Sequence, residues 1–217
     1  MLTMLENIDS AQLNQQFLQM YSQEQQLLYF IVIYLAAPFF LLIPVMVASV
    51  ITANSFAGEK ERKTLEGLLY TPVSMGELFI GKALAAFVPA IVTTFASFIV
   101  YGILVNSLAY PVFSELIFPT FNWVVLIFLI VPLLVLCIIF INIFISAKVK
   151  GFQEAYQLGG VVVLPIIGLV IGQATGFLFI SVQLLLGIGV GLAVICFVLF
   201  SVIKKKMNRY EFLERMN

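Results

Sequence analysis

The sequence predicts an all-α membrane protein, a polytopic bundle of about five transmembrane helices. Of its 217 residues, 62% are hydrophobic and only 10% are charged, whereas a soluble domain is about half apolar and about a quarter charged. Long stretches carry no charge at all, and a helix needs only about 20 apolar residues to cross a bilayer. The 11 basic residues also fall in segments that these helices would place on one side.

Uncharged stretches give the position of each span in turn. Residues 25–58, 83–114 and 116–147 have room for one helix each, and residues 155–203 have room for two. The expected spans, in chain order, are Leu27–Ala53, Ala83–Val105, Trp123–Ala147, Leu158–Ile171 and Gln183–Ile203. Between the last two, Gln173–Phe177 is polar and flexible enough for a turn or a re-entrant segment.

Basic residues predict the orientation of the bundle. With the Gln-rich residues 1–26 outside, the alternating spans place segments 54–82, 148–154 and 204–217 inside, and these three hold every Lys and Arg. Cytoplasmic loops of membrane proteins carry such an excess of basic residues. The sequence therefore predicts a multi-pass protein of the cell membrane. Its N-terminal segment is extracellular, its C-terminus is cytoplasmic, and residues 27–217 form a single transmembrane domain.

Glycines recur every fourth residue in the last two spans, at Gly168, Gly172 and Gly176 and again at Gly187 and Gly191. This spacing lets two helix backbones approach closely. The contact would lie either within the bundle or between two subunits, and the sequence leaves both open.

The spans lack the residue types that most membrane chemistry requires. There is no histidine, and no Asp, Glu, Lys or Arg lies in the core of an expected span, so a membrane enzyme, a metal site or an ion-coupled carrier is disfavoured. Cys137 and Cys196 lie in apolar runs, where we expect small buried hydrophobes rather than a structural disulfide. The net charge of zero gives no indication of a nucleic-acid partner.

The cytoplasmic segment 54–82 is predicted to form a short amphipathic helix, a turn and a second helix that continues into the next span. Glu59/Lys63 and Arg62/Glu66 are spaced as helical ion pairs, each worth about 0.2–0.5 kcal/mol. An apolar stripe follows at Leu65, Leu68 and Leu69.

The turn and the second helix have their own signals. Thr71 precedes Pro72, which disfavours helix continuation, and Ser74 with Glu77 fits a capping box that starts a helix near Met75. A charged helix lying on the membrane surface and a docking element for a cytosolic partner both fit this pattern.

Two of the basic segments carry long motifs. The longer motif is AGEKERKTLE at residues 57–66, followed by LLYTPVS at 68–74 and ELFIGK at 77–82. The second is SAKVKGFQEA at 146–155. Both motifs resemble those of the ABC type-2 permeases, the membrane subunits of ATP-driven exporters. The resemblance extends from about Leu27 to the C-terminus.

The resemblance implies that the longer match packs on a nucleotide-binding ATPase subunit. The implied coupling residues are Gly58, Glu59, Lys60, Glu61, Arg62, Thr64, Leu65, Glu66, Leu69, Thr71 and Pro72, with secondary contacts at Lys148, Lys150, Phe152 and Glu154. The chain has no G-x-x-x-x-G-K-[ST] phosphate loop, so ATP and Mg²⁺ would bind to the partner, and no cofactor would bind to this chain. Two permease chains, identical or different, would form the working unit with two ATPases.

The chain departs from this family in its number of spans. Such permeases typically have six spans and an internal N-terminus, whereas here the span before the first basic loop is the first. The resemblance therefore predicts a further span upstream, or a five-span variant. It implies a non-catalytic permease subunit that couples ATP hydrolysis to export. An ATP-independent channel or secondary carrier and a non-transporting scaffold remain the alternatives.

Overall fold

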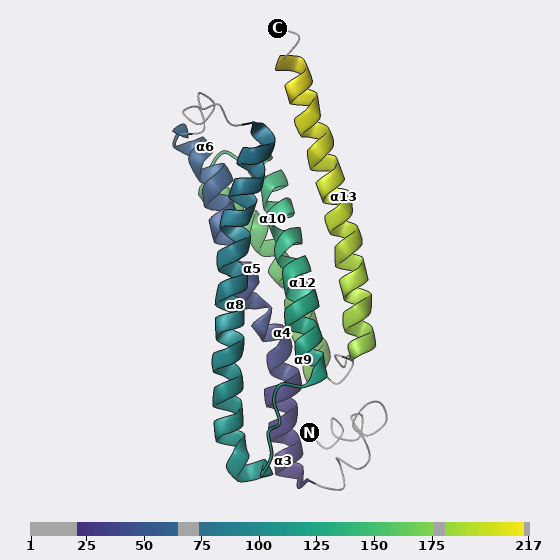
Figure 1. Cartoon of the computed structure of the whole chain (residues 1–217). Coiled ribbons are helices and arrows are strands. Elements are labelled where there is room, and N and C mark those ends of the chain that lie inside the picture. Colours follow the sequence, from purple (N-terminus) through teal and green to yellow (C-terminus); the bar gives the residue numbers. More distant parts are fainter. Residues whose placement is uncertain (1–20, 65–73, 176–180, 215–217) are drawn as a thin grey trace.

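The structure of the protein is a computed structural model that describes residues 21–64, 74–175 and 181–214, with the backbone alone for residues 206–214. Every regular element in these ranges is helical, and five of the helices are long and apolar enough to cross a membrane. The predicted all-α membrane fold is therefore confirmed (Figure 1).

The first span is one helical rod from Gln23 to Glu61 with two wide turns in it. Its parts are α3 (Gln23–Tyr29), the π-helix η1 (Phe30–Leu35), α4 (Ala36–Phe40), α5 (Leu42–Ala53), the π-helix η2 (Asn54–Gly58) and α6 (Glu59–Glu61). The rod begins four residues before the predicted Leu27, because Ser22 and Gln25 form a capping box that satisfies the first amide groups.

The second span, α8 (Met75–Phe113), extends well beyond the predicted Ala83–Val105. It begins where the sequence predicted a new helix: the Ser74 hydroxyl accepts from the Glu77 amide at 3.3 Å, and the Glu77 carboxylate accepts from the Ser74 amide at 3.0 Å. At its other end, the hydroxyl of Tyr21 donates a hydrogen bond to the carboxylate of Glu115.

The remaining three spans also exceed their predicted bounds. They consist of α9 (Phe121–Val125), π-helix η3 (Leu126–Ile130) and α10 (Val131–Lys148), then α11 (Phe152–Gly159), 3₁₀-helix η4 (Gly160–Val162) and α12 (Val163–Ala174), and finally α13 (Val182–Glu214). Of the expected turn between the last two spans, Gln173 and Ala174 belong to α12, and residues 176–177 lie outside the described residues.

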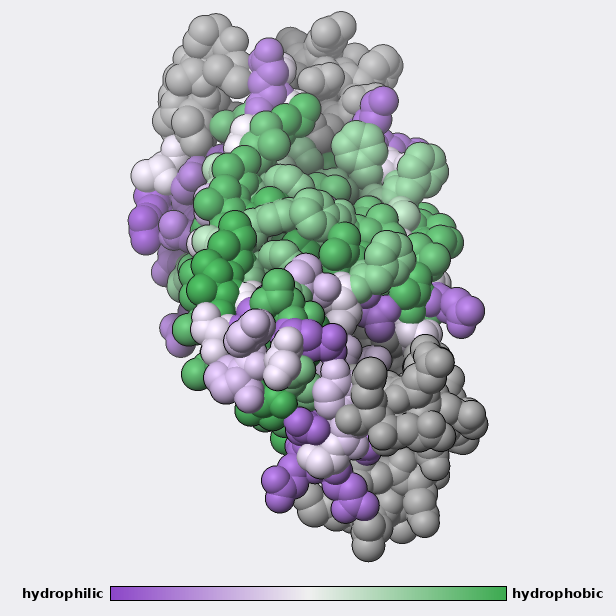
Figure 2. Space-filling model, turned by 60° about the horizontal axis from the view of Figure 1, so that its bottom comes forward, coloured by the Kyte–Doolittle hydropathy of each residue, from purple (hydrophilic) through white to green (hydrophobic). Residues whose placement is uncertain are grey.

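The third span is the centre of the bundle. In its most apolar stretch 56% of the residues are buried, against 17% for the second and fifth spans, and α10 contacts α5, α8, α11 and α13. The peripheral α13 stands at one side of the bundle (Figure 1). Apolar side chains cover the middle of the surface in Figure 2, with hydrophilic residues toward its lower part, as expected of a chain whose middle lies in hydrocarbon.

Aromatic side chains fill the half of the bundle away from the basic loops. Trp123 is 1% exposed and its ring meets those of Phe40 and Phe118 at centroid distances of 5.3 and 4.9 Å. Its indole nitrogen donates to the Ile33 carbonyl at 2.8 Å. The tryptophan therefore joins the third span to the backbone of the first.

Three of the spaced glycines do not bring helices together inside this chain. A Cβ added at Gly168, Gly187 or Gly191 would meet no atom within 4 Å, so of the two alternatives left open by the sequence, contact within the bundle does not apply to these three. The close contact is at Gly189, where a Cβ would lie 3.3 Å from Leu129. Cys137 and Cys196 are both buried free thiols, as predicted.

Candidate functional site at the basic end of the bundle

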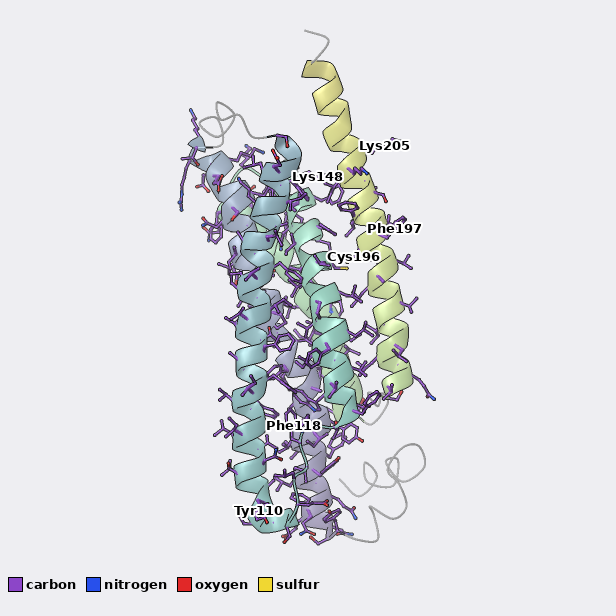
Figure 3. All side chains as sticks on the ribbon, in the orientation of Figure 1. Tyr110, Phe118, Lys148, Cys196, Phe197 and Lys205 are labelled. Carbon is purple, nitrogen blue, oxygen red and sulfur yellow. The ribbon has the colours of Figure 1, made fainter. Side chains whose placement is uncertain are left out.

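Three basic segments meet at one end of the molecule, which we call the basic end. They are η2 with α6, the start of α8, and the loop between α10 and α11, residues 149–151. The described basic side chains near the C-terminus, such as Lys205, lie toward the same end (Figure 3). The loops thus have the one-sided arrangement that their sequence predicted.

Lys82 joins the start of α8 to the end of the first span. Its Nζ lies 2.5 Å from Glu59 Oε2 and 2.7 Å from the Ser55 carbonyl oxygen, and 5.2 Å from the centroid of the Phe56 ring. Only 9% of Lys82 is exposed, and a buried ammonium group is stable only with such partners. Sequence reasoning placed Lys82 in the motif but gave it no role; its position just before a long uncharged stretch was the available signal.

Lys60 and Glu61 tie the end of the first span to the loop before α11. Lys60 Nζ donates to the Val149 carbonyl at 2.9 Å, and the Phe152 amide donates to Glu61 Oε2 at 2.9 Å. The Glu61 carboxylate therefore satisfies an amide at the N-terminus of α11, where negative charge is also favourable for the helix dipole. The structure thus brings the two predicted segments into direct contact.

A small apolar cluster lies beneath these polar ties. Its buried members are Ala53, Ala57, Val149 and Ala155, with Ile145 and Phe152 packed against them. Alanines keep the helix surfaces close enough for the charged side chains above to reach across. We call the polar ties together with this cluster the platform.

The first span ends where Lys63 adopts a left-handed conformation, with φ of 57°, which stops an α-helix. The motif start, Glu59–Glu61, is therefore the end of the first span rather than a separate amphipathic helix. The predicted Glu59/Lys63 pair is also wrong, since Glu59 pairs with Lys82. Thr64 instead bonds the Glu59 carbonyl at 3.2 Å.

Several predicted coupling residues lie outside the described residues. They are Leu65, Glu66, Leu69, Thr71 and Pro72, together with Leu68 of the predicted stripe. Gly58, by contrast, is buried in η2.

Other charged side chains at this end are open to solvent. Arg62, Lys63, Lys148, Lys150 and Glu154 are all exposed. The Glu154 carboxylate accepts from the Lys150 amide at 3.1 Å and so closes the loop before α11. Glu59, Lys60 and Glu61 have partners inside the chain, although Lys60 and Glu61 are also exposed. Arg62 and Lys63 follow directly after the first span and are exposed as well.

A comparison with known protein families matches residues 1–213 to the ABC-2 family transporter proteins. The chain belongs to this family. The match includes the N-terminal residues that the sequence motifs alone did not cover, and it identifies the chain as a membrane-spanning permease subunit of an ABC transporter. Membrane subunits of the family are generally non-catalytic and imply an ABC ATPase partner. No curated protein and no solved structure matches the chain.

Below the platform, the ABC-2 permease has a layer of buried polar side chains that sequence reasoning missed. Asn142 of α10 is fully buried and its Nδ2 donates to Ser49 Oγ of α5 at 3.3 Å. Thr52 and Ser146 lie one turn nearer the basic end on the same two helices and are 0% and 4% exposed. An asparagine inside a 32-residue uncharged stretch was the signal that could have found this layer.

The third helix of this layer, α11, comes close to Asn142 because its contacting residue is a glycine. A Cβ added at Gly159, the last residue of α11, would lie 2.1 Å from Asn142 Oδ1. Only a residue without a side chain leaves room for Asn142 to sit between α5 and α11. Because α11 also carries Phe152, whose amide is bonded by Glu61, the permease connects its platform to the centre of the bundle through one short helix.

Proposed function

We propose that this permease couples ATP hydrolysis by a separate nucleotide-binding subunit to export of a substrate across the cell membrane. The basic end faces the cytoplasm, the N-terminal segment lies outside, and two permease chains work with two ATPases. ATP and Mg²⁺ belong to the ATPase, and this chain binds neither. The observation that carries the proposal is the platform, which ties three helices together at the end where all described basic residues gather.

The hydrogen bonds and the ion pair of the platform assign different roles in coupling to different residues of the motif. Glu59, Lys60 and Glu61 hold η2, α8 and α11 together, so a force on one of them moves all three. Arg62 and Lys63 face outward and offer positive charge to the ATPase, with Lys148, Lys150 and Glu154 as a second contact beside them. Complementary charge of this kind mainly sets partner choice and association rate.

Movement would then enter the bundle along two routes. A movement of the platform would shift α8 through Lys82. It would also shift α11, which contacts Asn142 through Gly159 and so reaches α5 and α10. Both routes lie in the described residues: the first runs through the Lys82–Glu59 ion pair, and the second through the close contact of Gly159 with Asn142. Closure of the ATPases would shift the platform, and the spans would rearrange to change access across the membrane.

Purification of the tagged full-length chain from its own membranes tests this proposal. We expect a chain with a Walker-type phosphate loop to co-purify and to hydrolyse ATP. Arg62→Ala should weaken that association several-fold, because it removes an outward charge without touching the platform. Lys204→Ala is the matched control: it removes one exposed charge from α13 and should leave the association unchanged. Purification without any ATPase would contradict the proposal and favour an ATP-independent carrier or a scaffold.

A further inference from the structure

A run of basic residues ends the fifth span at the basic end of the molecule. Lys204, Lys205 and Lys206 are consecutive, and Arg209 follows in the same helix. Before this run the chain is uncharged back to residue 155. The platform involves none of these residues. The run is therefore a second basic feature, separate from the platform.

The two lysines of the run whose side chains the structure describes, Lys204 and Lys205, are exposed. Within the described residues neither has a hydrogen bond or an ion pair, in contrast to Lys82, which is buried against Glu59. The next acidic residue along the chain is Glu211. Both ammonium groups are therefore available to a negatively charged partner.

The length of α13 places these lysines at the boundary of the hydrocarbon. From Val182, where the helix begins, to Ile203 it rises about 32 Å at 1.5 Å per residue, and the hydrocarbon core of a bilayer is about 30 Å thick. Lys204 follows Ile203 directly. An ammonium group at this depth lies among the lipid headgroups, which the long side chain of a lysine reaches.

An exposed apolar face of α13 continues from the lysines into the hydrocarbon. Val198 and Val194 precede Lys205 by seven and eleven residues, and Phe197 precedes Lys204 by seven. Each spacing returns to within about 20° of the same helix face, since one residue turns the chain by about 100°. Val198, Val194 and Phe197 are 52%, 57% and 73% exposed. Val194 lies about 16 Å below Lys205, which is about half of the hydrocarbon thickness and so the depth of one leaflet.

We propose that this face of α13 binds an anionic phospholipid of the leaflet at the basic end. The lipid phosphate lies against Lys204 and Lys205, and one acyl chain follows Phe197 and Val198 down to Val194; we call these five residues the lipid face. A basic cluster directly after a span attracts anionic lipid, with about fivefold in affinity for each lysine. The inference does not depend on the proposed coupling to an ATPase, because α13 packs on α9, η3 and α10 and the lipid face is no part of the platform.

Charge favours a lipid over a second copy of the chain on this face. Two chains in one membrane with their C-termini on the same side would meet here with Lys204 and Lys205 of both chains at the same depth. Their like charges would repel each other at the edge of the hydrocarbon, where partly buried charges are poorly screened. A lipid phosphate neutralises these charges instead.

Lipid binding to the purified full-length chain tests the proposal. The chain is freed of native lipid in uncharged detergent and titrated with phosphatidylglycerol or with phosphatidylcholine of the same acyl chains, and bound lipid is counted by native mass spectrometry. We expect half-saturation with phosphatidylglycerol at a concentration at least about ten times lower. Lys205→Ala should raise that concentration about fivefold without changing the value for phosphatidylcholine, and Lys205→Arg should retain the original value.

Matched controls separate the lipid face from a general attraction to positive charge. Lys150→Ala removes an exposed lysine from the loop before α11 and should leave the binding of both lipids unchanged. Inorganic phosphate should not displace the lipid, because it lacks the acyl chains. Equal binding of both lipids, an equal effect of Lys150→Ala, or displacement by inorganic phosphate would overturn the proposal. So would a disulfide between two chains that carry Phe197→Cys, because it would place a second copy on this face.

Discussion

Gly159 is the position where the smallest change should have the largest effect on this permease. A glycine-to-alanine change inside a helix normally stabilises it by about 1 kcal/mol. Here the added Cβ would lie 2.1 Å from Asn142 Oδ1, so Asn142 must retreat by about 1 Å to reach the closest distances that Cβ atoms tolerate. Overpacking of this kind costs about 1–3 kcal/mol.

The retreat also affects a second contact of Asn142. Its hydrogen bond to Ser49 spans 3.3 Å, and losing such a bond costs about 0.5–1.5 kcal/mol. These losses outweigh the gain in helix propensity, so Gly159→Ala should lower the free energy of unfolding by about 1–3 kcal/mol. Denaturant or heat unfolding of the purified chain in detergent micelles measures this change.

The chain offers a matched control one residue away. A Cβ added at Gly160 would meet nothing within 4 Å, so Gly160→Ala should be neutral or slightly stabilising. Adding Gly159→Ala to Asn142→Ala should cost little, because the obstructing oxygen is gone, and the resulting coupling energy identifies the contact. A Gly159→Ala protein as stable as the original would refute the reasoning.

Three further predictions concern the two ends and the centre of the bundle. Glu59→Ala should destabilise the chain by about 1 kcal/mol, a modest value because Glu59 is partly exposed, and Glu59→Ala with Lys82→Ala should recover part of the loss in the same unfolding assay. Trp123→Phe should cost about 1–3 kcal/mol because the Ile33 carbonyl loses its donor in a buried site; an unchanged unfolding midpoint would contradict this. The hydrogen bond to Glu115, followed by burial, raises the pKa of Tyr21 above its ordinary value of 10.0. The Tyr21–Glu115 contact should therefore stabilise the protein below pH 10 and be lost as the pH rises through the higher folded value, and Glu115→Gln should weaken this alkaline dependence.

Local signals predicted well, since they need only neighbouring residues. The capping box at Ser74 and Glu77 started α8 where expected, and uncharged stretches located all five spans. The same capping signal at Ser22 and Gln25 would have moved the start of the first span to its observed place.

Contacts between distant segments could not be predicted from the spacing of residues in the sequence. Glu59 was expected to pair with Lys63, four residues away, because a continuous helix was assumed; the left-handed Lys63 ends that helix, and the carboxylate turns to Lys82. The closeness of Asn142 to Gly159 depends on how three helices pack, which no spacing in the sequence encodes. For the same reason, the family resemblance indicated which segments to examine but not which of their side chains are exposed.

The π-helix η2 determines the face of the helix on which the first residues of the basic motif lie. A π-turn holds one residue more than an α-turn, and each residue of an α-helix turns the chain by about 100°. Regular α-helical turns over the same residues would swing Glu59 and Lys60 by about 100°, away from Lys82 and Val149. Deleting one residue from Asn54–Gly58 would instead restore a regular helix and leave both side chains near their present face. The wide turn therefore accommodates one additional residue between the transmembrane span and the basic motif without changing the direction in which the motif faces.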